Sequence, residues 1–455
     1  MVIIHVPSGE VRALAGSPDY AEPVSGQVNC AVSPRSPGSA LKPFIYGLAF
    51  DRGLCTPETV LADVPVAWSD YRPENFDGRF RGPVTVRAAL TDSLNVPAVG
   101  MAKRLGVPEL LQLFRQVGLS TLDKPAGHYG LGIAIGDGGV TLLDLTNAYA
   151  GLARGGLFFP CRLTATDERS VGKRLLSPGA AWMITDILRN KSRPASTDNI
   201  PTAGSCPEFV WKTGTSNGYR DAWAIGYTLE YAVGIWIGNP AGTPARDLTG
   251  STMAAPLLKD IFRRLYPKGN SPPFRRPEEV KTRTVCALTG LPPTRNCPGT
   301  VEGEYISGIS PSGFCAVHRK VKVHDGSPGK EYRIGEEWPP EIAVFMEEQK
   351  KGEWNVKTEQ EKTGGVTRHG TPLKITAPLT GETFRRMDTG LTGQNRIAVS
   401  ASGGAGKIYW FENGIYLGTS SSGECLFREI GKRGELRIAC IDEEGHGDRV
   451  KIAVE

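Results

Sequence analysis

Three short groups of residues have side chains that suit acyl transfer to a serine. They are Ser39-Ala-Leu-Lys42, Ser93-Leu-Asn95 and Lys212-Thr213-Gly214-Thr215. In this order they read S-x-x-K, S-x-N and K-T-G, three elements that can combine a serine nucleophile with lysine side chains. Each element is too short to be specific by itself. The sequence around each copy therefore decides whether we interpret it as part of an active site.

The chemistry of these residues points to a lysine as the base. A serine hydroxyl is a poor nucleophile until a base removes its proton. The sequence has no G-x-S-x-G element, and no histidine is placed near Ser39. Lys42 is the candidate, because burial and nearby positive charge lower the pKa of a lysine. Lys212 would supply that charge, and the backbone N–H groups of Ser39 and Thr215 would stabilise an oxyanion.

Two of the elements have further copies in less suitable surroundings. S-x-x-K also occurs at Ser170–Lys173 and Ser327–Lys330, and K-T-G also occurs at Lys362–Gly364. Neither of these serines is followed by an apolar stripe, and Lys362 lies in a polar stretch. S-x-N occurs once. These surroundings favour the copies that begin at Ser39 and Lys212.

The residues after Ser39 predict a helix that begins there. An apolar stripe at helical spacing is formed by Leu41, Phe44, Ile45 and Leu48. Gly53 stands where this helix should end. Because Ser39 and Lys42 are three residues apart, their side chains would share one face. The apolar residues 209–211 before Lys212 are typical of a strand.

Composition and periodicity divide the chain into three parts. Residues 1–270 mix helical stripes with strands, which predicts an α/β or α+β domain with an antiparallel sheet. Residues 271–371 form a linker that contains cysteines and a very polar run at 347–370, which we expect to be mobile. Residues 372–455 contain short alternating runs and an Asn413-Gly414 turn, which predict a small β-sandwich that serves in binding or docking.

Bulk properties exclude some functions. A chain of 455 residues suits two or three domains. The net charge of +5 is spread along the sequence without an arginine-rich helix, so we predict no nucleic-acid partner. No stretch approaches the roughly 20 apolar residues of a membrane helix. The first residues of the sequence do not have the pattern of a signal peptide.

The sequence alone does not decide whether the cysteines bind a metal ion. Cys286, Cys297 and Cys315 fall close together, and Cys315 opens the run Cys-Ala-Val-His318. Three thiols and an imidazole suit a structural zinc ion. The gaps between these cysteines are not the short paired spacings of zinc fingers, so a disulfide or unbonded thiols are the favoured alternatives. We therefore predict no cofactor and keep zinc as the less favoured reading.

Longer stretches around the motifs resemble the class A penicillin-binding proteins, and within them the 1C subfamily. The stretches that carry the resemblance are Arg35–Phe44, Asp92–Ala98, Gly130–Gly136, Thr141–Gly156 and Lys212–Trp223. Residues 286–318 and 338–341 resemble the linker of that subfamily, and residues 372–455 resemble its C-terminal β module. The resemblance implies an α+β transpeptidase domain in which helices flank the antiparallel sheet.

The resemblance also implies a role for each motif residue. Ser39 would attack the penultimate D-Ala carbonyl of a peptidoglycan stem peptide, and Lys42 would accept its proton. Ser93 would relay a proton to the leaving nitrogen. Asn95 would hold the peptide amide and orient Lys42. The residues implied to bind the terminal carboxylate are Lys212, Thr213, Gly214 and Thr215.

The implied partners follow from this activity. They are peptidoglycan stem peptides, β-lactam antibiotics, and cell-wall or divisome proteins at the C-terminal module. Such proteins normally begin with a membrane anchor and a glycosyltransferase domain, which we expect to be missing here, and they work in the periplasm. The alternatives are a non-catalytic cell-wall scaffold and a D,D-carboxypeptidase or β-lactamase-like hydrolase. For a β-lactamase we find no Glu-x-x-Leu-Asn segment to activate a water.

Overall fold

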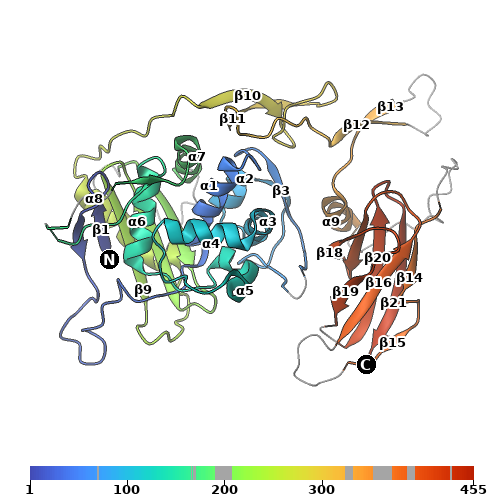
Figure 1. Ribbon diagram of the computed structural model, residues 1–455, viewed down its shortest axis with the longest axis horizontal. Helices are drawn as coiled ribbons and strands as arrows, with labels where there is room; N and C mark the ends of the chain where they lie inside the picture. Colours follow the sequence, from blue (N-terminus) through green and yellow to red (C-terminus); the bar gives the residue numbers. More distant parts are fainter. Residues whose placement is uncertain are drawn as a thin grey trace. The chain divides into compact units, whose positions relative to one another are not determined.

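A five-stranded antiparallel sheet contains the third motif (Figure 1). Its strands, in order across the sheet, are β2 (Val11–Leu14), β1 (Val2–His5), β9 (Tyr231–Gly238), β8 (Asp221–Tyr227) and β7 (Val210–Thr215). Every residue of β8 is buried, whereas β7 lies at the edge and alternates between buried and half-buried residues. Strands β1 and β2 pair as an antiparallel hairpin, and so do β8 and β9.

The structure is a computed structural model whose described residues form two compact units. The described residues are 1–68, 71–164, 166–167, 171–189, 207–322, 332–351, 371–386, 395–430 and 433–455. The first unit comprises residues 1–60 and 85–315, and the second comprises residues 61–84 and 316–455. Among the described helices, none is both long and apolar enough to cross a membrane.

Helices pack on both faces of the five-stranded sheet. On one face lies α6 (Leu142–Ala153), whose Thr141 cap accepts the Asp144 N–H at 3.0 Å. The Tyr149 ring of α6 packs edge-on against the Tyr227 ring of β8. On the other face, α8 (Ala255–Leu265) packs Phe262 into a core shared with β8 and β9. An α+β domain with a helix-flanked antiparallel sheet is therefore confirmed.

Shorter elements complete the first unit. Its remaining helices are η1 (Gly38–Leu41), α1 (Lys42–Asp51), α2 (Val86–Thr91), α3 (Asn95–Leu105), α4 (Val107–Gln116), α5 (Ala126–Tyr129), η2 (Gly130–Ile135), α7 (Pro178–Leu188) and η4 (Gly250–Ala254). Three two-stranded sheets pair β3 (Val60–Asp63) with β4 (Gly82–Thr85), β5 (Leu157–Phe158) with β6 (Lys173–Arg174), and β10 (Val280–Cys286) with β11 (Thr300–Ile306). Of these strands, β3 and β4 consist mostly of residues from the segment 61–84, which belongs to the second unit.

Two sheets around one apolar core make up most of the second unit. The three-stranded sheet has the order β14 (Lys374–Ala377), β16 (Arg396–Ser402) and β19 (Leu426–Glu429). The five-stranded sheet has the order β15 (Thr383–Phe384), β21 (Gly447–Val454), β20 (Gly434–Asp442), β17 (Ile408–Glu412) and β18 (Ile415–Ser420). Side chains from both sheets, including Val399 and Trp410, share the core. The predicted β-rich C-terminal region is confirmed, including its hairpin turn, where Asn413 and Gly414 both have positive φ.

Residues 61–84 belong to the second unit although they lie between two helices of the first in sequence. The Ala67 N–H donates to the Tyr416 carbonyl at 2.7 Å, and Arg72 pairs with the nearly buried Glu412 at 2.7 Å. The sequence analysis placed this segment in the transpeptidase part. Its pairing with β18 connects residues about 350 positions apart, which no local pattern could indicate.

The linker region also contains regular structure. It holds the hairpin of β12 (His318–Lys322) with β13 (Tyr332–Glu336), and the helix α9 (Pro340–Lys351). The first residues of the polar run predicted to be mobile, 347–351, thus belong to α9. The rest of that run lies outside the described residues, as do Ser170, the copy Ser327–Lys330 and the copy Lys362–Gly364.

Candidate active site

Ser39 lies in η1, the short turn that leads directly into α1. The Lys42 N–H donates a hydrogen bond to the Ser39 carbonyl, so the two residues stand one turn apart at the helix start. The Lys42 side chain is fully buried, whereas Ser39 is half-buried. The predicted helix is confirmed, and it presents a partly accessible hydroxyl beside a buried amine.

Three hydrogen bonds from outside η1 hold the residues on either side of Ser39. The Trp223 Nε1–H donates to the Ser36 carbonyl at 2.8 Å, and the Ser36 hydroxyl donates to the Gly136 carbonyl at 2.9 Å. The Tyr149 hydroxyl donates to the Ala40 carbonyl at 2.8 Å. Because strands, helices and loops all contribute, the position of the serine depends on the whole first unit.

Two glycines allow η1 and the edge strand β7 to approach closely. Gly38 has a φ of +54°, a region that favours glycine. A Cβ on Gly38 would collide with the backbone of Thr215, and a Cβ on Gly214 would collide with the Pro37 carbonyl. Because neither glycine has a side chain, the strand that contains K-T-G can lie directly against the turn that carries Ser39.

The S-x-N motif supplies the partners of Lys42. The Lys42 Nζ donates to the Ser93 carbonyl at 2.6 Å and to the Asn95 Oδ1 at 2.7 Å. Asn95 begins α3, and Ser93 precedes it with a φ of +59°. A non-glycine residue in this region is strained, and such strain is concentrated at functional sites. The unusual backbone turns the Ser93 carbonyl toward Lys42.

The same serine contacts the lysine of the third motif. The Lys212 side chain is 1% exposed, and its Nζ donates to the Ser93 Oγ at 2.8 Å and to the Thr213 carbonyl at 2.8 Å. Ser93 therefore binds one lysine through its backbone and the other through its hydroxyl. Four motif residues from three distant segments meet here, namely Lys42, Ser93, Asn95 and Lys212, and Ser39 lies one turn before Lys42.

The two threonines of the third motif are placed differently. Lys212 and Gly214 oppose Ile225 and Trp223 of β8 and share their face of the sheet. Thr213 and Thr215 alternate with them and point to the other face, where the Thr215 Oγ1 accepts the Gly250 N–H at 3.0 Å. The carboxylate-binding role of both threonines stays a prediction.

The backbone of Thr215, unlike its side chain, lies at the serine. The Ser216 N–H donates across to the Asp221 carbonyl at 3.0 Å. Successive N–H groups of a strand point to opposite sides, so the Thr215 N–H points away from β8. The Thr215 nitrogen lies close to Gly38, beside Ser39. This geometry suits a second oxyanion donor.

Sequence reasoning missed the residues that hold η1 in place. Ser36 binds Gly136 at 100 positions and Trp223 at 187 positions, and Tyr149 binds Ala40 at 109 positions along the chain. In the sequence, Tyr149 stands among the apolar residues of the stretch Thr141–Gly156. The Tyr149 hydroxyl is a polar group on a buried helix face. It is the one signal that could have indicated a hydrogen bond within the core.

The structure brings the four candidate metal ligands together. The ligand atoms of Cys286, Cys297, Cys315 and His318 all lie within 4.8 Å of one another. No disulfide joins any of the cysteines within the described ranges. A disulfide, one of the favoured alternatives of the sequence analysis, is therefore not what the structure contains.

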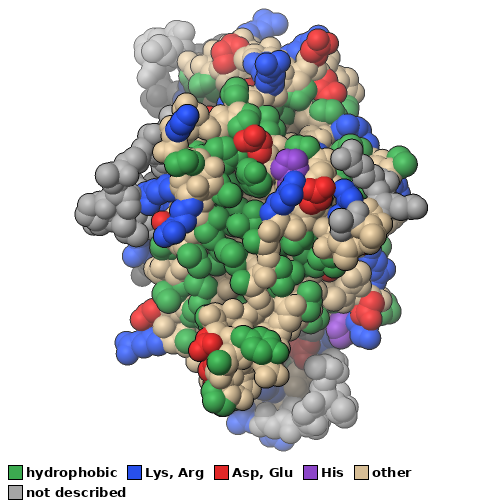
Figure 2. All heavy atoms as spheres, turned by 90° about the vertical axis from the view of Figure 1, so that its left-hand side faces the viewer, with side chains coloured by type: hydrophobic (Ala, Val, Ile, Leu, Met, Phe, Trp, Pro, Cys, Tyr) green, Lys and Arg blue, Asp and Glu red, His purple; other side chains and the backbone are tan. Residues whose placement is uncertain are grey.

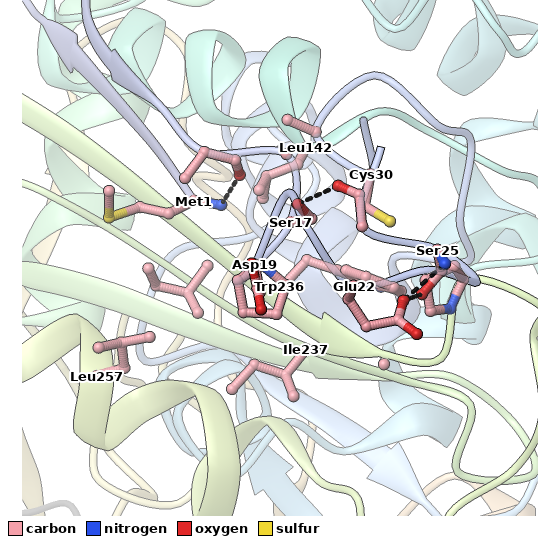
Figure 3. Close-up of a pocket in the computed structure, with 18 residues that line it drawn as sticks. Met1, Ser17, Asp19, Glu22, Ser25, Cys30, Leu142, Trp236, Ile237 and Leu257 are labelled. Carbon is pink, nitrogen blue, oxygen red and sulfur yellow. Dashed lines mark hydrogen bonds between the residues drawn. The ribbon is translucent and has the colours of Figure 1, made fainter. Parts of the chain in front are cut away.

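A cavity of about 520 Å³ lies elsewhere in the first unit, between the loop after β2 and the strand β9 (Figure 3). Hydrophobic side chains such as Trp236, Ile237 and Leu257 line it. The face shown in Figure 2 likewise displays a broad hydrophobic area with Lys and Arg at its margins. None of the motif residues lines this cavity, so the candidate chemistry is located in the cluster around Ser93.

Comparison with known proteins assigns families to both ends of the chain. Residues 1–263 match the penicillin binding protein transpeptidase domain, and residues 363–452 match the Penicillin-Binding Protein C-terminus Family. The chain is 31% identical to Penicillin-binding protein 1C of Escherichia coli over its whole length, which covers 61% of that protein. It is 30% identical to Penicillin-binding protein 1F of Bacillus subtilis, over 62% of this chain and 40% of that protein.

A solved structure supports the fold. The crystal structure of Penicillin-Binding Protein 1A from Haemophilus influenzae matches with a TM-score of 0.58 at 20% identity. The match covers 69% of this chain and 54% of that one. At this identity the likeness extends to the fold alone.

Proposed function

This chain belongs to the penicillin-binding protein transpeptidase family, and from that premise we propose that it cross-links peptidoglycan stem peptides through an acyl-enzyme on Ser39. One observation carries the proposal: Ser93 is hydrogen-bonded to both Lys42 and Lys212, at the turn that holds Ser39. This arrangement supports the assignment of Ser39 as nucleophile, Lys42 as base and Ser93 as proton relay.

In the first step, the Ser39 Oγ attacks the penultimate D-Ala carbonyl of the stem peptide. Lys42 accepts the hydroxyl proton as a neutral amine. Two buried cations around Ser93 would repel each other, which favours a neutral Lys42 while Lys212 stays charged. The oxyanion is bound by the N–H groups of Ser39 and Thr215, which lie on the two segments that Gly38 and Gly214 bring together.

In the second step, the bond to the terminal D-Ala breaks and its nitrogen takes up a proton. We expect the Ser93 hydroxyl to pass on the proton that Lys42 took from Ser39, while the Lys212 ammonium, which donates to the Ser93 Oγ at 2.8 Å, orients that hydroxyl. Asn95 keeps Lys42 oriented and binds the peptide amide. The buried Lys212 attracts the terminal carboxylate, assisted by Thr213, Gly214 and Thr215.

In the third step, an amine of a neighbouring stem peptide attacks the acyl-enzyme and forms the cross-link. Attack by water instead gives D,D-carboxypeptidase activity. β-Lactams acylate Ser39 because their ring amide occupies the place of the D-Ala-D-Ala bond. The whole chain works in the periplasm, where these substrates lie, and the C-terminal module binds cell-wall or divisome proteins.

The proposal predicts that the purified chain releases D-alanine from a synthetic stem pentapeptide that ends in D-Ala-D-Ala. With a D-amino acid added in excess as the acceptor amine, the tetrapeptide acyl group is joined to the acceptor through a new amide bond, whereas hydrolysis leaves the free tetrapeptide. Liquid chromatography with mass detection separates both products. Ser39→Ala loses both, whereas Ser327→Ala, in another S-x-x-K copy, retains them.

Other outcomes of this assay decide between the alternatives. Release of D-alanine with no amide product at any acceptor concentration indicates a D,D-carboxypeptidase. Rapid, repeated hydrolysis of benzylpenicillin indicates a β-lactamase-like enzyme. A folded protein that reacts with neither the pentapeptide nor penicillin indicates a scaffold and contradicts the proposal.

A further inference from the structure

We propose that Cys286, Cys297, Cys315 and His318 bind one structural zinc ion. Their four ligand atoms lie within 4.8 Å of one another, and Cys286, Cys315 and His318 are less than 5% exposed. In a tetrahedral site with Zn–S bonds of about 2.3 Å, ligand atoms are separated by about 3.8 Å. The side chains thus need only small rotations to converge on one ion.

The backbone brings the three cysteines together independently of any metal. Cys286 ends β10, opposite Thr300 of β11, so the loop that contains Cys297 starts and ends at this point. The Cys286 N–H donates to the Leu291 carbonyl at 2.8 Å, and the Cys315 N–H donates to the Pro292 carbonyl at 2.8 Å. Two cysteines are therefore bound to neighbouring carbonyls of the same loop.

The sulfur of Cys297 lies in the middle of the cluster. It interacts with the thiols of both Cys286 and Cys315. The Thr294 N–H donates to this sulfur at 3.3 Å, and the Thr294 hydroxyl lies 3.7 Å from it. Hydrogen-bond donors aimed at a sulfur suit a metal-bound thiolate, because outer partners of this kind orient metal ligands.

The donor set selects zinc and a structural role. Three sulfurs and one imidazole make a complete tetrahedral set, which leaves no open position for a substrate or water. Thiolates favour Zn²⁺ over Mg²⁺ or Ca²⁺. A disulfide would bond only two of the three sulfurs and would leave the third thiol and the imidazole buried against it. On binding, the three thiols release their protons and become thiolates.

The chain around the cluster explains why a metal would be needed. A two-stranded hairpin such as β10–β11 is marginally stable in water. The loop between its strands, 287–299, and the segment after it, 307–317, contain no helix or strand in the described structure. A metal would cross-link these segments at four points between residues 286 and 318. All four residues lie within one stretch of 33 residues, in which His318 follows Cys315 by three positions.

Metal analysis of the full chain tests this site. Protein purified in reducing buffer without chelators should contain about one zinc ion per chain by plasma mass spectrometry. Cys297→Ser and His318→Ala should lose most of this zinc. Cys161→Ser removes a half-buried thiol outside the cluster and should retain it.

Cobalt substitution gives a second readout that does not require any variant to fold. Wild-type protein loaded with Co²⁺ should show the intense visible bands of a tetrahedral site and thiolate-to-cobalt charge transfer. His318→Cys should keep the metal and increase the charge-transfer intensity, because a fourth sulfur replaces the nitrogen. The proposal is overturned if folded, reduced wild-type protein takes up neither ion, if Cys161→Ser loses zinc as the cluster variants do, or if peptide mapping finds a disulfide within the cluster.

Discussion

Replacing Lys42 by alanine should slow the acylation of Ser39 by benzylpenicillin about 10²–10⁴-fold, the range that a general base contributes. Lys42 is the buried amine one turn from Ser39, and it is held by Ser93 and Asn95. Without it, no described side chain at this turn is placed to take the hydroxyl proton. The rate is measured by quenching the reaction at set times and determining the acylated fraction by intact-protein mass spectrometry.

Two further variants separate the role of base from that of charge. Lys42→Arg keeps a positive charge of similar reach, but arginine cannot lose its proton in a protein. This variant should therefore be as slow as Lys42→Ala, provided that thermal unfolding shows it to be folded. Lys173→Ala, in another S-x-x-K copy and exposed on β6, should react at the wild-type rate. Near-normal acylation of Lys42→Arg would contradict the assignment of the base.

Replacing Lys212 by alanine should lower the acylation rate about 10²–10³-fold, the cost of removing one preorganised electrostatic contact. Its buried ammonium binds the Ser93 hydroxyl and is the positive charge nearest to the proposed carboxylate site. The effect should depend on the substrate. Wild-type enzyme should prefer a peptide that ends in a free carboxylate over the same peptide amidated at its C-terminus, and Lys212→Ala should lose this preference.

The measurement compares kcat/KM for the two peptides in each variant. Lys259→Ala is the matched control, because this lysine of α8 has its Nζ 5.8 Å from the centre of the Trp211 ring, on the face of β7 opposite to Lys212. It should leave both the rate and the preference unchanged. If Lys212→Ala is slow but still discriminates between acid and amide, the lysine acts on the proton relay and does not bind the carboxylate.

Much of the candidate site could be predicted, because residues close in sequence to each functional side chain determine the helix or strand that carries it. The apolar stripe after Ser39 indicated the helix that positions Lys42, and the apolar residues before Lys212 indicated the strand β7. Thr141 and Gly155 bracket α6 in the manner expected of helix ends. In each case the pattern that predicts the element lies within a dozen residues of the functional side chain.

The features that escaped prediction depend on register and on distant contacts. The pairing of Gly214 with Trp223 decides that Lys212 points toward Ser93 while Thr213 and Thr215 point away. Shifting this register by one residue would exchange the two faces. The left-handed backbone of Ser93 likewise follows from its tertiary surroundings, since serine itself does not favour it.

The cysteine cluster illustrates the same limit. The spacing between Cys286, Cys297 and Cys315 argued against a metal site because it lacks the short pairs of zinc fingers. The hairpin of β10 and β11 closes the first interval, and the bond from Cys315 to the Pro292 carbonyl closes the second. Three-dimensional proximity here comes from strand pairing, which spacing along the chain does not reveal.

The most direct test of the central claim is intact-protein mass spectrometry after brief exposure to benzylpenicillin, followed by peptide mapping. The account predicts one stable penicilloyl adduct per chain, located on Ser39 and absent from folded Ser39→Ala. An adduct on another residue, or none on folded wild-type protein, would contradict it.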